Sequence, residues 1–517
     1  MSDILVMKGI RKVYPNGIVA NENVDFSVKE GEIHSLMGEN GAGKSTLMKM
    51  LFGIETPDDG EIFLKGEKVS IPSPTVAIEK GIGMVHQHFM LVPSLTVAEN
   101  MVLGMEPKKG LSIDFEKAVK MTEEVSKKYN LKVDPRAKVE DLTVGTKQKI
   151  EILKALIRGA KILILDEPTA VLTPQETKEL FEELVGLKNN GHTIIFISHK
   201  LKEIKQICNR ITIMRNGRSV GTYDVKDVTQ EDISRLMVGR DVVIKVNKTK
   251  ANPKESIVDV KNVTCLDDSG KKLLNDISLS IRKGEILGIA GVEGNGQGEL
   301  VELITGLKKI SHGDIIIDNK SIKNLDIKGI RNIGTSHIPE DRMILGAAAA
   351  ATIQDNLISE RIDSKEIKKG ILLNMKKIKE MAKQLVVDYK VKCDSPDQGV
   401  GMLSGGNIQK VVVAREFSSN PKFLVADQPT RGIDIGAATF IRNRLVELRD
   451  DGVGILLVSA DLNEVMELSD SLIVMYGGEI TAYFKDTSEI TEEELGLYML
   501  GLKKQSEEEI RRVIYEK

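Results

Sequence analysis

The chain has 517 residues, which is more than one hydrophobic core usually supports, so at least two domains are expected. Its 73 basic and 76 acidic residues leave a net charge of −3, and this balance argues against a global field that would attract nucleic acid or anionic lipid. Hydrophobic residues make up 41% and charged residues 29%, a composition far from that of a disordered or a membrane-embedded chain.

The first residues do not follow the pattern of a secretory signal, and no apolar stretch approaches the length of about 20 residues that a membrane span needs. Cys208, Cys265 and Cys393 are scattered and lack the spacing of a zinc site or a disulfide framework. We therefore expect reduced thiols packed in the core and a cytosolic environment.

A glycine-rich loop follows an apolar strand and opens a helix near residue 40. It has the pattern Gly38-x4-Gly43-Lys44-Ser45, whose backbone N–H groups converge on phosphate oxygens at a helix N-terminus. Lys44 is expected to reach the β- and γ-phosphates of a nucleotide, and Ser45 to ligate Mg²⁺. Two nearby histidines, His86 and His88, are read as packed or solvated side chains, because two residues alone do not make a metal site.

Helical periodicity dominates residues 89–157, most clearly in 97–103, 115–129 and 147–156, and predicts a helical subdomain. Short apolar runs at 161–165, 193–197 and 211–215 then alternate with helical stretches, which predicts a largely parallel sheet. The first of these runs ends in Asp166 and Glu167. An Asp at that place holds the metal, and the Glu polarises the attacking water.

The sequence contains an internal repeat that covers most of the chain. The segment 38–45 recurs at 291–298, an offset of 253, and Asp166 recurs as Asp427, an offset of 261. Strands are predicted again at 423–426, 455–459 and 472–476. We therefore predict an α/β fold with two tandem domains, 1–240 and 255–500, joined by a linker at 241–254 and followed by a charged tail at 501–517 that is a helix or a frayed end.

Two further motifs narrow the class of nucleotide-binding protein. Leu403-Ser404-Gly405-Gly406 and Gln409 precede a helix in the second copy, and Leu142-Thr143-Val144-Gly145 lies in the corresponding place in the first. Gln87 falls between the phosphate loop and this motif, and His199 follows the strand 193–197. These residues resemble the signature, Q-loop and switch-histidine motifs of the ATP-binding cassette (ABC) family, and the resemblance covers about residues 4–500.

The resemblance implies two cassettes of mostly parallel sheet, each with an antiparallel portion and an inserted helical subdomain. It also implies ATP and Mg²⁺ as cofactors, with cassettes packed head to tail so that each nucleotide lies between the phosphate loop of one and the signature of the other. Tyr14 stands where the family stacks an aromatic ring on adenine, although an ordinary packed tyrosine is the alternative. The implied first site has Lys44, Gln87, Glu167 and His199 as catalytic residues, Ser45, Gln87 and Asp166 as metal ligands, and these nucleotide-binding residues: Tyr14, Gly38, Asn40, Gly41, Gly43, Lys44, Ser45, Thr46, Ser404, Gly405, Gly406, Gln409 and Asp434.

The second implied site departs from the family pattern at nearly every position. Its residues are Gln297 for Lys, Gly298 for Ser, Glu340 for Gln, Gln428 for Glu and Ala460 for His, with Thr143, Val144 and Thr173 from the first copy. A neutral amide cannot balance γ-phosphate charge, and a glutamine is a poorer base than a carboxylate. Hydrolysis at this site should be very slow or absent, although nucleotide could still bind there.

Tandem, unequal cassettes are similar to the ATPase subunits of bacterial simple-sugar importers, and the segments 294–297, 338–342 and 426–434 look most like the nucleoside branch. The implied partners are two integral membrane permease subunits and, indirectly, an extracytoplasmic binding protein, with no nucleic acid; the implied location is the cytoplasmic face of the cell membrane.

Two alternatives are a tandem ATPase that acts on ribosomes or DNA and a regulatory scaffold without turnover. A contact surface for the permease is expected at Met84, Phe89, Met90, Leu91 and Leu95, with core packing as the alternative, and the alanine run 347–351 is left as either a helix or an altered loop.

Overall fold

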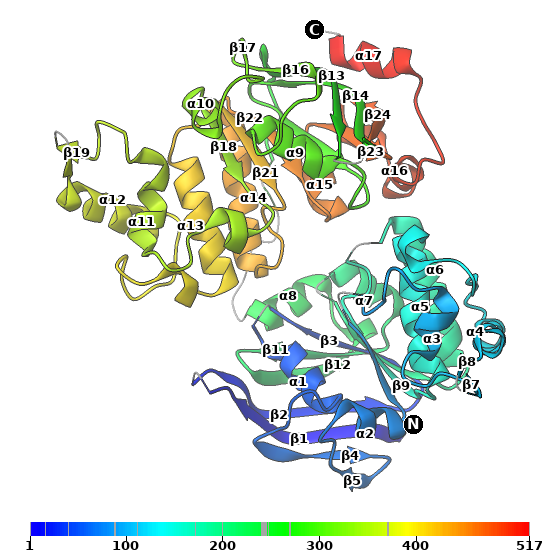
Figure 1. Ribbon diagram of the computed structural model, residues 1–517. Coiled ribbons are helices and arrows are strands. Elements are labelled where there is room, and N and C mark those ends of the chain that lie inside the picture. Colours follow the sequence, from blue (N-terminus) through cyan, green and yellow to red (C-terminus); the bar gives the residue numbers. More distant parts are fainter. Residues whose placement is uncertain are drawn as a thin grey trace. The chain divides into compact units, whose positions relative to one another are not determined.

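The computed structural model describes residues 2–15, 17–39, 41–86, 89–110, 112–170, 172–198, 200–238, 246, 248–267, 270–369 and 372–515. The chain forms two compact units, Met1–Val242 and Val243–Lys517 (Figure 1).

The strands of the first unit form an antiparallel sheet and a mixed sheet. Their bounds are β1 Asp3–Val13, β2 Val19–Lys29, β3 Ile33–Gly38, β4 Asp59–Leu64, β5 Glu67–Val69, β6 Ile82–Val85, β9 Ile162–Asp166, β10 Thr193–Ile197, β11 Arg210–Arg215 and β12 Arg218–Asp224. The antiparallel sheet has the order β2-β1-β4-β5, and the mixed sheet has the order β12-β11-β3-β10-β9-β6. All neighbours in the mixed sheet are parallel except β11 and β12. Strands β3 and β10 are buried along their whole length, as expected for a parallel sheet covered on both faces.

Helices of the first unit cover the mixed sheet and form a subdomain. Their bounds are α1 Lys44–Leu51, α2 Pro74–Glu79, α3 Val97–Val102, α4 Phe115–Tyr129, α5 Val144–Ile157, α6 Pro174–Asn189, α7 Leu201–Ile207 and α8 Gln230–Val238. Helices α3, α4 and α5 pack on one another (Figure 1), together with a short hairpin of β7 Lys108–Lys109 and β8 Ser112–Ile113. This confirms the predicted helical subdomain, and the predicted strands of the first copy agree with β9, β10 and β11 to within one residue.

The second unit repeats this architecture. Its strands are β13 Ser256–Leu266, β14 Lys272–Arg282, β15 Ile286–Ala290, β16 His312–Ile317, β17 Lys320–Ser321, β18 Thr335–Ile338, β21 Phe423–Asp427, β22 Gly454–Val458, β23 Ser471–Tyr476 and β24 Glu479–Phe484. The sheet orders are β14-β13-β16-β17 and β18-β21-β22-β15-β23-β24. Each strand of the first mixed sheet therefore has a counterpart in the same place of the second, which confirms the predicted fold of two α/β units.

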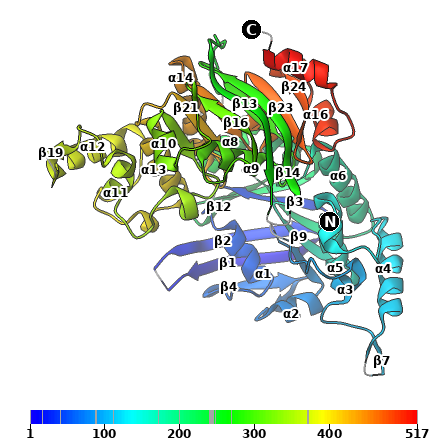
Figure 2. The same ribbon diagram turned by 45° about the horizontal axis from the view of Figure 1, so that its top comes forward.

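The helices of the second unit also match those of the first. They are α9 Gln297–Thr305, α10 Ile327–Asn332, α11 Ile353–Ile358, α12 Met375–Asp388, α13 Gly405–Phe417, α14 Ile435–Asp450, α15 Leu462–Leu468, α16 Glu492–Met499 and α17 Glu507–Tyr515, with a hairpin of β19 Lys368–Lys369 and β20 Leu372–Leu373. Helices α6 and α14 correspond at an offset of 261 along their whole length. The charged tail forms α17, which packs on β24 (Figure 2) and buries Ile510.

The alanine run 347–351 is a loop in the second unit, which decides between the two predicted alternatives. The Asn356 side chain clamps it: Oδ1 accepts from the Ala348 N–H at 2.8 Å, and Nδ2 donates to the Ala348 carbonyl at 3.1 Å. Asn100 holds Val92 in the same way in the first unit. The loop of the second copy therefore keeps this clamp, and its alanines have shorter side chains than most residues of the corresponding loop in the first copy.

The expected permease-contact residues divide between core and surface. Met84 lies in the hydrophobic core of the first unit, so that part of the prediction is wrong and the packing alternative holds, because β6 is buried in the sheet. Met90 is 61% exposed, and Val92 beside it is also exposed.

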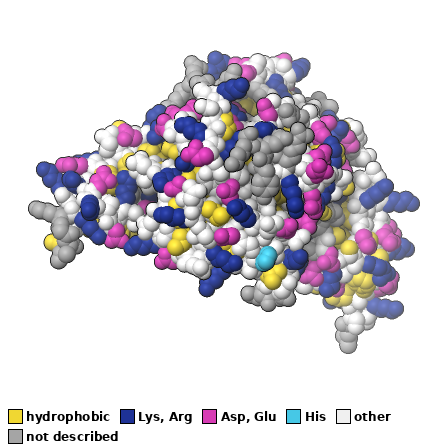
Figure 3. Space-filling model, turned by 90° about the horizontal axis from the view of Figure 1, so that it is seen from above, with side chains coloured by type: hydrophobic (Ala, Val, Ile, Leu, Met, Phe, Trp, Pro, Cys, Tyr) yellow, Lys and Arg dark blue, Asp and Glu magenta, His cyan; other side chains and the backbone are white. Residues whose placement is uncertain are grey.

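The surface and the cysteines fit the composition of the chain. Basic and acidic side chains are interspersed on the face seen in Figure 3. Cys208 and Cys265 are buried free thiols, and Cys393 is a partly exposed one. Among the described residues, no helix is both long enough and apolar enough to cross a membrane.

Candidate functional site

The phosphate loop of the first unit connects β3 to α1, as its motif predicts. Gly41 and Gly43 have φ of 82° and 94°, a left-handed conformation that glycine adopts without strain. A Cβ on Gly43 would also lie 2.3 Å from the Ala20 carbonyl oxygen, so only glycine fits there. Lys44 is buried, and its Nζ donates to the carbonyls of Gly38 at 2.7 Å and Glu39 at 3.0 Å. The loop thus holds the ammonium group at the mouth of the helix N-terminus, where anions bind.

Two acidic residues lie at the carboxyl end of β9, close enough to Lys44 to interact electrostatically. Burial, and after it the Glu167 carboxylate, raises the pKa of Asp166 to about 6, although Lys44 and Lys49 oppose the shift. Burial lowers the pKa of Lys44, and the Glu167 and Asp166 carboxylates counteract that effect. The structure therefore brings Lys44, Asp166 and Glu167 together, as the two separate sequence motifs predict.

The donor set at this site suits a divalent cation. Asp166 is a half-buried carboxylate whose pKa is raised by its surroundings, so added positive charge would stabilise its ionised form. Ser45 is exposed at the start of α1 and offers a hydroxyl oxygen. Carboxylate and hydroxyl oxygens are the ligands that Mg²⁺ uses beside nucleotide phosphates.

Glu167 has an unusual backbone conformation for a residue with a side chain. Its φ is 48°, and its N–H donates to the Ile197 carbonyl at 2.9 Å. Gln428 repeats this in the second unit with φ of 50° and a hydrogen bond from its N–H to Val458. Positive φ is costly for residues other than glycine and persists where the surrounding structure holds it, often at functional sites. The strand-end turn is therefore the same in both copies although the side chain differs.

Tyr14 contacts the helix that follows the phosphate loop. Its hydroxyl is 3.3 Å from the Thr46 hydroxyl on α1, and the ring is half-buried. This position is compatible with both predicted alternatives. Asn21 is a residue that the sequence did not reveal: it is fully buried, and its Nδ2 donates to the Gly43 carbonyl at 3.3 Å.

A second group of predicted residues forms a cluster in the second unit. Ser404 begins α13, and the buried Gln409 donates from Nε2 to the Pro429 carbonyl at 3.0 Å. Asp434 begins α14, and a Cβ on Gly406 would lie 3.1 Å from its Oδ2. The signature turn and the loop after β21 are therefore in contact, and a side chain at position 406 would require the Asp434 carboxylate to shift.

Arg342 connects this cluster to the segment after β18. Its Nη1 donates to the Arg431 carbonyl at 2.8 Å, and a Cβ on Gly405 would lie 2.7 Å from its Nη2. A guanidinium group thus lies beside the N-terminus of α13. Nothing in the sequence pattern singled out Arg342 for this contact.

Asn40, Gln87 and His199 lie outside the described residues, so their predicted roles stay predictions. His88 lies outside them too, and among the described residues there is no cluster of three His, Cys, Asp or Glu side chains that could hold a metal.

The buried Glu203 connects the loop after β9 to the end of β10. The Glu203 carboxylate accepts hydrogen bonds from the hydroxyls of Thr169 at 2.8 Å and Ser198 at 3.0 Å. In the second unit Glu464 binds Thr430 at 2.6 Å and Ser459 at 2.7 Å in the same way. Neither glutamate belongs to a recognisable motif, although their offset of 261 matches that of Asp166 and Asp427.

The second phosphate loop satisfies its polar groups internally. Gln297, where the first copy has Lys44, donates from Nε2 to the Val292 carbonyl at 3.1 Å and accepts from the Asn295 N–H at 3.2 Å. Gln428 accepts from the Ala460 N–H at 3.0 Å, so the residues that stand where the first copy has Glu167 and His199 bind each other. Glu340 forms an ion pair with Arg431.

The charge balance also differs at the end of β21. Burial, and after it the Glu340 carboxylate, raises the pKa of Asp427 to about 7, although the Arg431 guanidinium opposes the shift. No lysine replaces the cation that Lys44 supplies in the first unit. The second loop therefore lacks the ammonium group that Lys44 supplies beside the phosphates at the first loop.

Comparisons with known proteins agree with this geometry. The family model described as ABC transporter matches residues 21–170 and 274–431. The chain is 47% identical over 501 residues to the guanosine import ATP-binding protein NupO of Bacillus subtilis, covering 97% of this chain and 98% of that protein. It is 42% identical over 527 residues to the glucose import ATP-binding protein TsgD13 of Haloferax volcanii, covering 96% of each.

A solved structure that covers most of the chain is the complex of an archaeal ribosomal stalk protein with an archaeal ribosome recycling factor. The TM-score is 0.58 at 20% identity, covering 92% of this chain and 90% of that one, and at this identity the likeness shows the fold alone. The matches to the family model and to the relatives nevertheless span both copies of the repeat. The chain therefore belongs to the ABC transporter family, as an ATPase subunit that carries two cassettes in tandem.

Proposed function

We propose that this chain is the energy-coupling ATPase subunit of an importer for nucleosides or simple sugars. The observation that carries the proposal is that a complete phosphate loop with Asp166 and Glu167 occurs in one unit and a complete signature turn at 404–406 occurs in the other. Neither unit holds both. One competent ATP site requires the two units to contribute together.

In this proposal the first site performs the chemistry. Lys44 binds the β- and γ-phosphates, Tyr14 stacks on the adenine ring, and the N-terminus of α13 with Ser404 binds the γ-phosphate from the other side. Glu167 accepts the proton of the attacking water, and His199 and Gln87 hold the γ-phosphate and the water in line. Ser45, Asp166 and Gln87 would hold Mg²⁺, which would neutralise charge on the phosphate oxygens.

The transport cycle follows from the closing and opening of the two units around ATP. The permease subunits in the membrane would change their access as the cassettes close, and hydrolysis would allow reopening. The exposed Met90 and Val92 are suited to contact a short cytoplasmic helix of a permease, because an apolar side chain on the surface gains by burial. The chain would then lie at the cytoplasmic face of the membrane, and an extracytoplasmic binding protein would select the solute.

The second site is proposed to be inactive in hydrolysis. We expect Gln428→Glu alone to leave steady-state ATPase within about twofold of the parent, because Gln297, Gly298 and Ala460 still lack the charge, the metal ligand and the histidine. Phosphate release by the full chain measures this. The matched control adds Glu167→Gln to the same variant and should show no turnover. A rate more than doubled by Gln428→Glu would mean that the second site was nearly competent.

The rival function, a tandem ATPase that acts on ribosomes or DNA, is disfavoured by the two relatives of high identity, both of which are import ATP-binding proteins by name. Within import, the guanosine relative and the glutamines at positions 297 and 428 favour a nucleoside. The test is uptake of labelled guanosine and labelled ribose by a strain lacking this gene, with and without a plasmid copy. We expect the loss and rescue of guanosine uptake, while loss of ribose uptake alone would assign the chain to sugars.

A further inference from the structure

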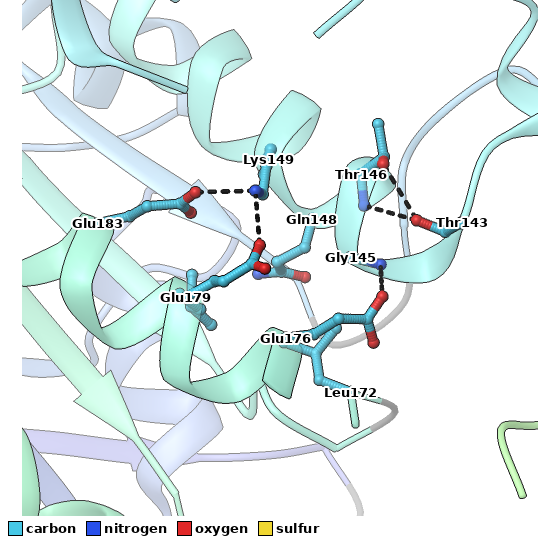
Figure 4. A pocket seen from close by; sticks show the side chains of 10 residues that line it. Thr143, Gly145, Thr146, Gln148, Lys149, Leu172, Glu176, Glu179 and Glu183 are labelled. Carbon is cyan, nitrogen blue, oxygen red and sulfur yellow. Dashed lines mark hydrogen bonds and ion pairs between the residues drawn. The ribbon is translucent and has the colours of Figure 1, made fainter. Parts of the chain in front are cut away.

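The N-terminus of the first signature helix, α5, is covered by a carboxylate from the same unit. The Gly145 N–H donates to Glu176 Oε1 at 3.1 Å (Figure 4). A Cβ on Gly145 would lie 2.5 Å from that oxygen. The contact is thus between the backbone of the signature turn and a negative charge.

Glu176 is held in this place by its own helix. It is the third residue of α6, and its Oε2 accepts from the Thr173 N–H at 3.0 Å and from the Thr173 hydroxyl at 3.1 Å, while the Thr173 hydroxyl accepts from the Glu176 N–H at 3.2 Å. This reciprocal arrangement is a capping box, which fixes the side chain at the helix start. One carboxylate oxygen caps α6, and the other is left to reach α5.

The carboxylate next to the equivalent glycine of the second unit, Gly406, comes from Asp434 and not from the position that corresponds to Glu176. Position 437, which corresponds to Glu176 at the offset of 261, is a buried alanine. Asp434 approaches Gly406, but its Oδ1 accepts from the Ala437 N–H at 2.8 Å and so caps its own helix, α14. The group beside the neighbouring Gly405 is the Arg342 guanidinium. A carboxylate therefore lies beside both signature turns. The turns differ in that the Gly145 N–H donates to its carboxylate and that a guanidinium group also lies beside the second turn.

The helices α6 and α14 also differ in the charge of the side chains that follow these first residues. On α6, Glu176, Glu179 and Glu183 line a pocket next to the turn, where Lys149 pairs with Glu179 at 3.2 Å and Glu183 at 2.9 Å (Figure 4). The corresponding residues of α14 are Ala437, Phe440 and Arg444. The three glutamates on this face of α6 thus have no acidic counterparts at the same positions of α14.

We propose that the Glu176 carboxylate takes the place of a nucleotide phosphate at the first signature helix, and that the alanine at position 437 leaves the second signature helix open for one. This inference rests on the proposed pairing of each signature with the phosphate loop of the other unit. A helix N-terminus binds anions through its free N–H groups, so a bound carboxylate both uses a donor and repels the γ-phosphate. Glu176 is then a residue that weakens nucleotide binding at the second site, in addition to the replacements at 297, 298, 428 and 460 that keep this site from hydrolysing ATP.

The main test transfers the carboxylate to the competent site. We expect Ala437→Glu to lower the steady-state ATPase of the full chain by about 100-fold, the usual effect of losing one donor to a developing charge. Ala437→Gln has the same volume without the charge and should retain most of the activity. Equal losses in both variants at an unchanged unfolding temperature would contradict the role of charge, as would full activity of Ala437→Glu.

A second variant covers the case in which Ala437→Glu does not fold. Glu176→Gln keeps the capping box, because glutamine serves at that position as well as glutamate. In a chain that also carries Glu167→Gln, so that ATP is not consumed, equilibrium dialysis with labelled ATP should detect a second bound nucleotide whose affinity is raised about tenfold over the Glu167→Gln parent. An unchanged number and affinity of bound ATP would overturn the proposal.

Ser404→Arg separates this inference from the proposed function. If Ser404→Arg abolishes ATPase and Ala437→Glu does not, the units pair as proposed and only the role of Glu176 is wrong. If Ser404→Arg retains full ATPase, the pairing itself is wrong.

Discussion

Glu167→Gln is expected to abolish steady-state ATPase, with a loss of about 10³-fold or more, since a positioned general base contributes about 10²–10⁴-fold. The amide has the size of the carboxylate but cannot accept a proton. The left-handed backbone of this residue is compatible with glutamine, because Gln428 adopts the same φ in the second unit. The variant should therefore fold normally and retain bound ATP.

Phosphate release and ATP retention after gel filtration measure the two halves of this prediction. The unfolding temperature of the variant should match that of the parent, since the Glu167 N–H bond to Ile197 does not involve the side chain. Turnover near the parental rate would remove Glu167 from the role of base.

Ser404→Arg is expected to reduce ATPase by about 100-fold although the residue belongs to the other unit from Lys44 and Glu167. Ser404 is exposed at the start of α13, so an arginine meets solvent and does not disturb the core. In the proposed pairing the longer side chain would fill the space for the γ-phosphate of the nucleotide. Phosphate release by the full chain measures the effect.

Thr143→Arg is the matched control, because Thr143 is exposed at the corresponding start of α5. It faces the site proposed to be inactive, so ATPase should change by less than about twofold. The lost cap on the Thr146 N–H should cost about 1 kcal/mol of stability. A strong loss of ATPase in Thr143→Arg and none in Ser404→Arg would reverse the assignment of the two sites.

Much of the fold could be predicted because the repeat and the buried strands leave a direct trace in the chain. β10 is a run of five buried residues, and α4 has both predicted bounds, since Asp114 and Asn130 cap it. The short antiparallel strands were less visible, because half-exposed strands such as β5 carry few apolar residues. Permease contact and core packing both stayed open for Met84, because an apolar side chain suits either place and only the packing of β6 decides for the core.

The site could be predicted where chemistry depends on a local motif. Lys44, Asp166 and Glu167 each belong to such a motif and lie together as expected. Asn21, Glu203 and Arg342 could not be found, because each acts through a contact with a residue distant in the chain. The pattern of Thr173 and Glu176 indicates a helix start, but the reach of its second oxygen to Gly145 depends on how α5 and α6 pack.

Glu203 and Glu464 make the same bonds to a threonine and a serine in both units, although the catalytic residues around Glu464 have been replaced. The hydrogen bonds that hold this strand-end loop are therefore kept in the second unit, although the residues proposed for hydrolysis are not. In the proposed function one unit carries the catalytic residues, and the other keeps the structural framework without them. If the units pair as proposed, loss of the Glu464 carboxylate should lower the ATPase activity of the first site, because the loop that contains Thr430 would lose its support.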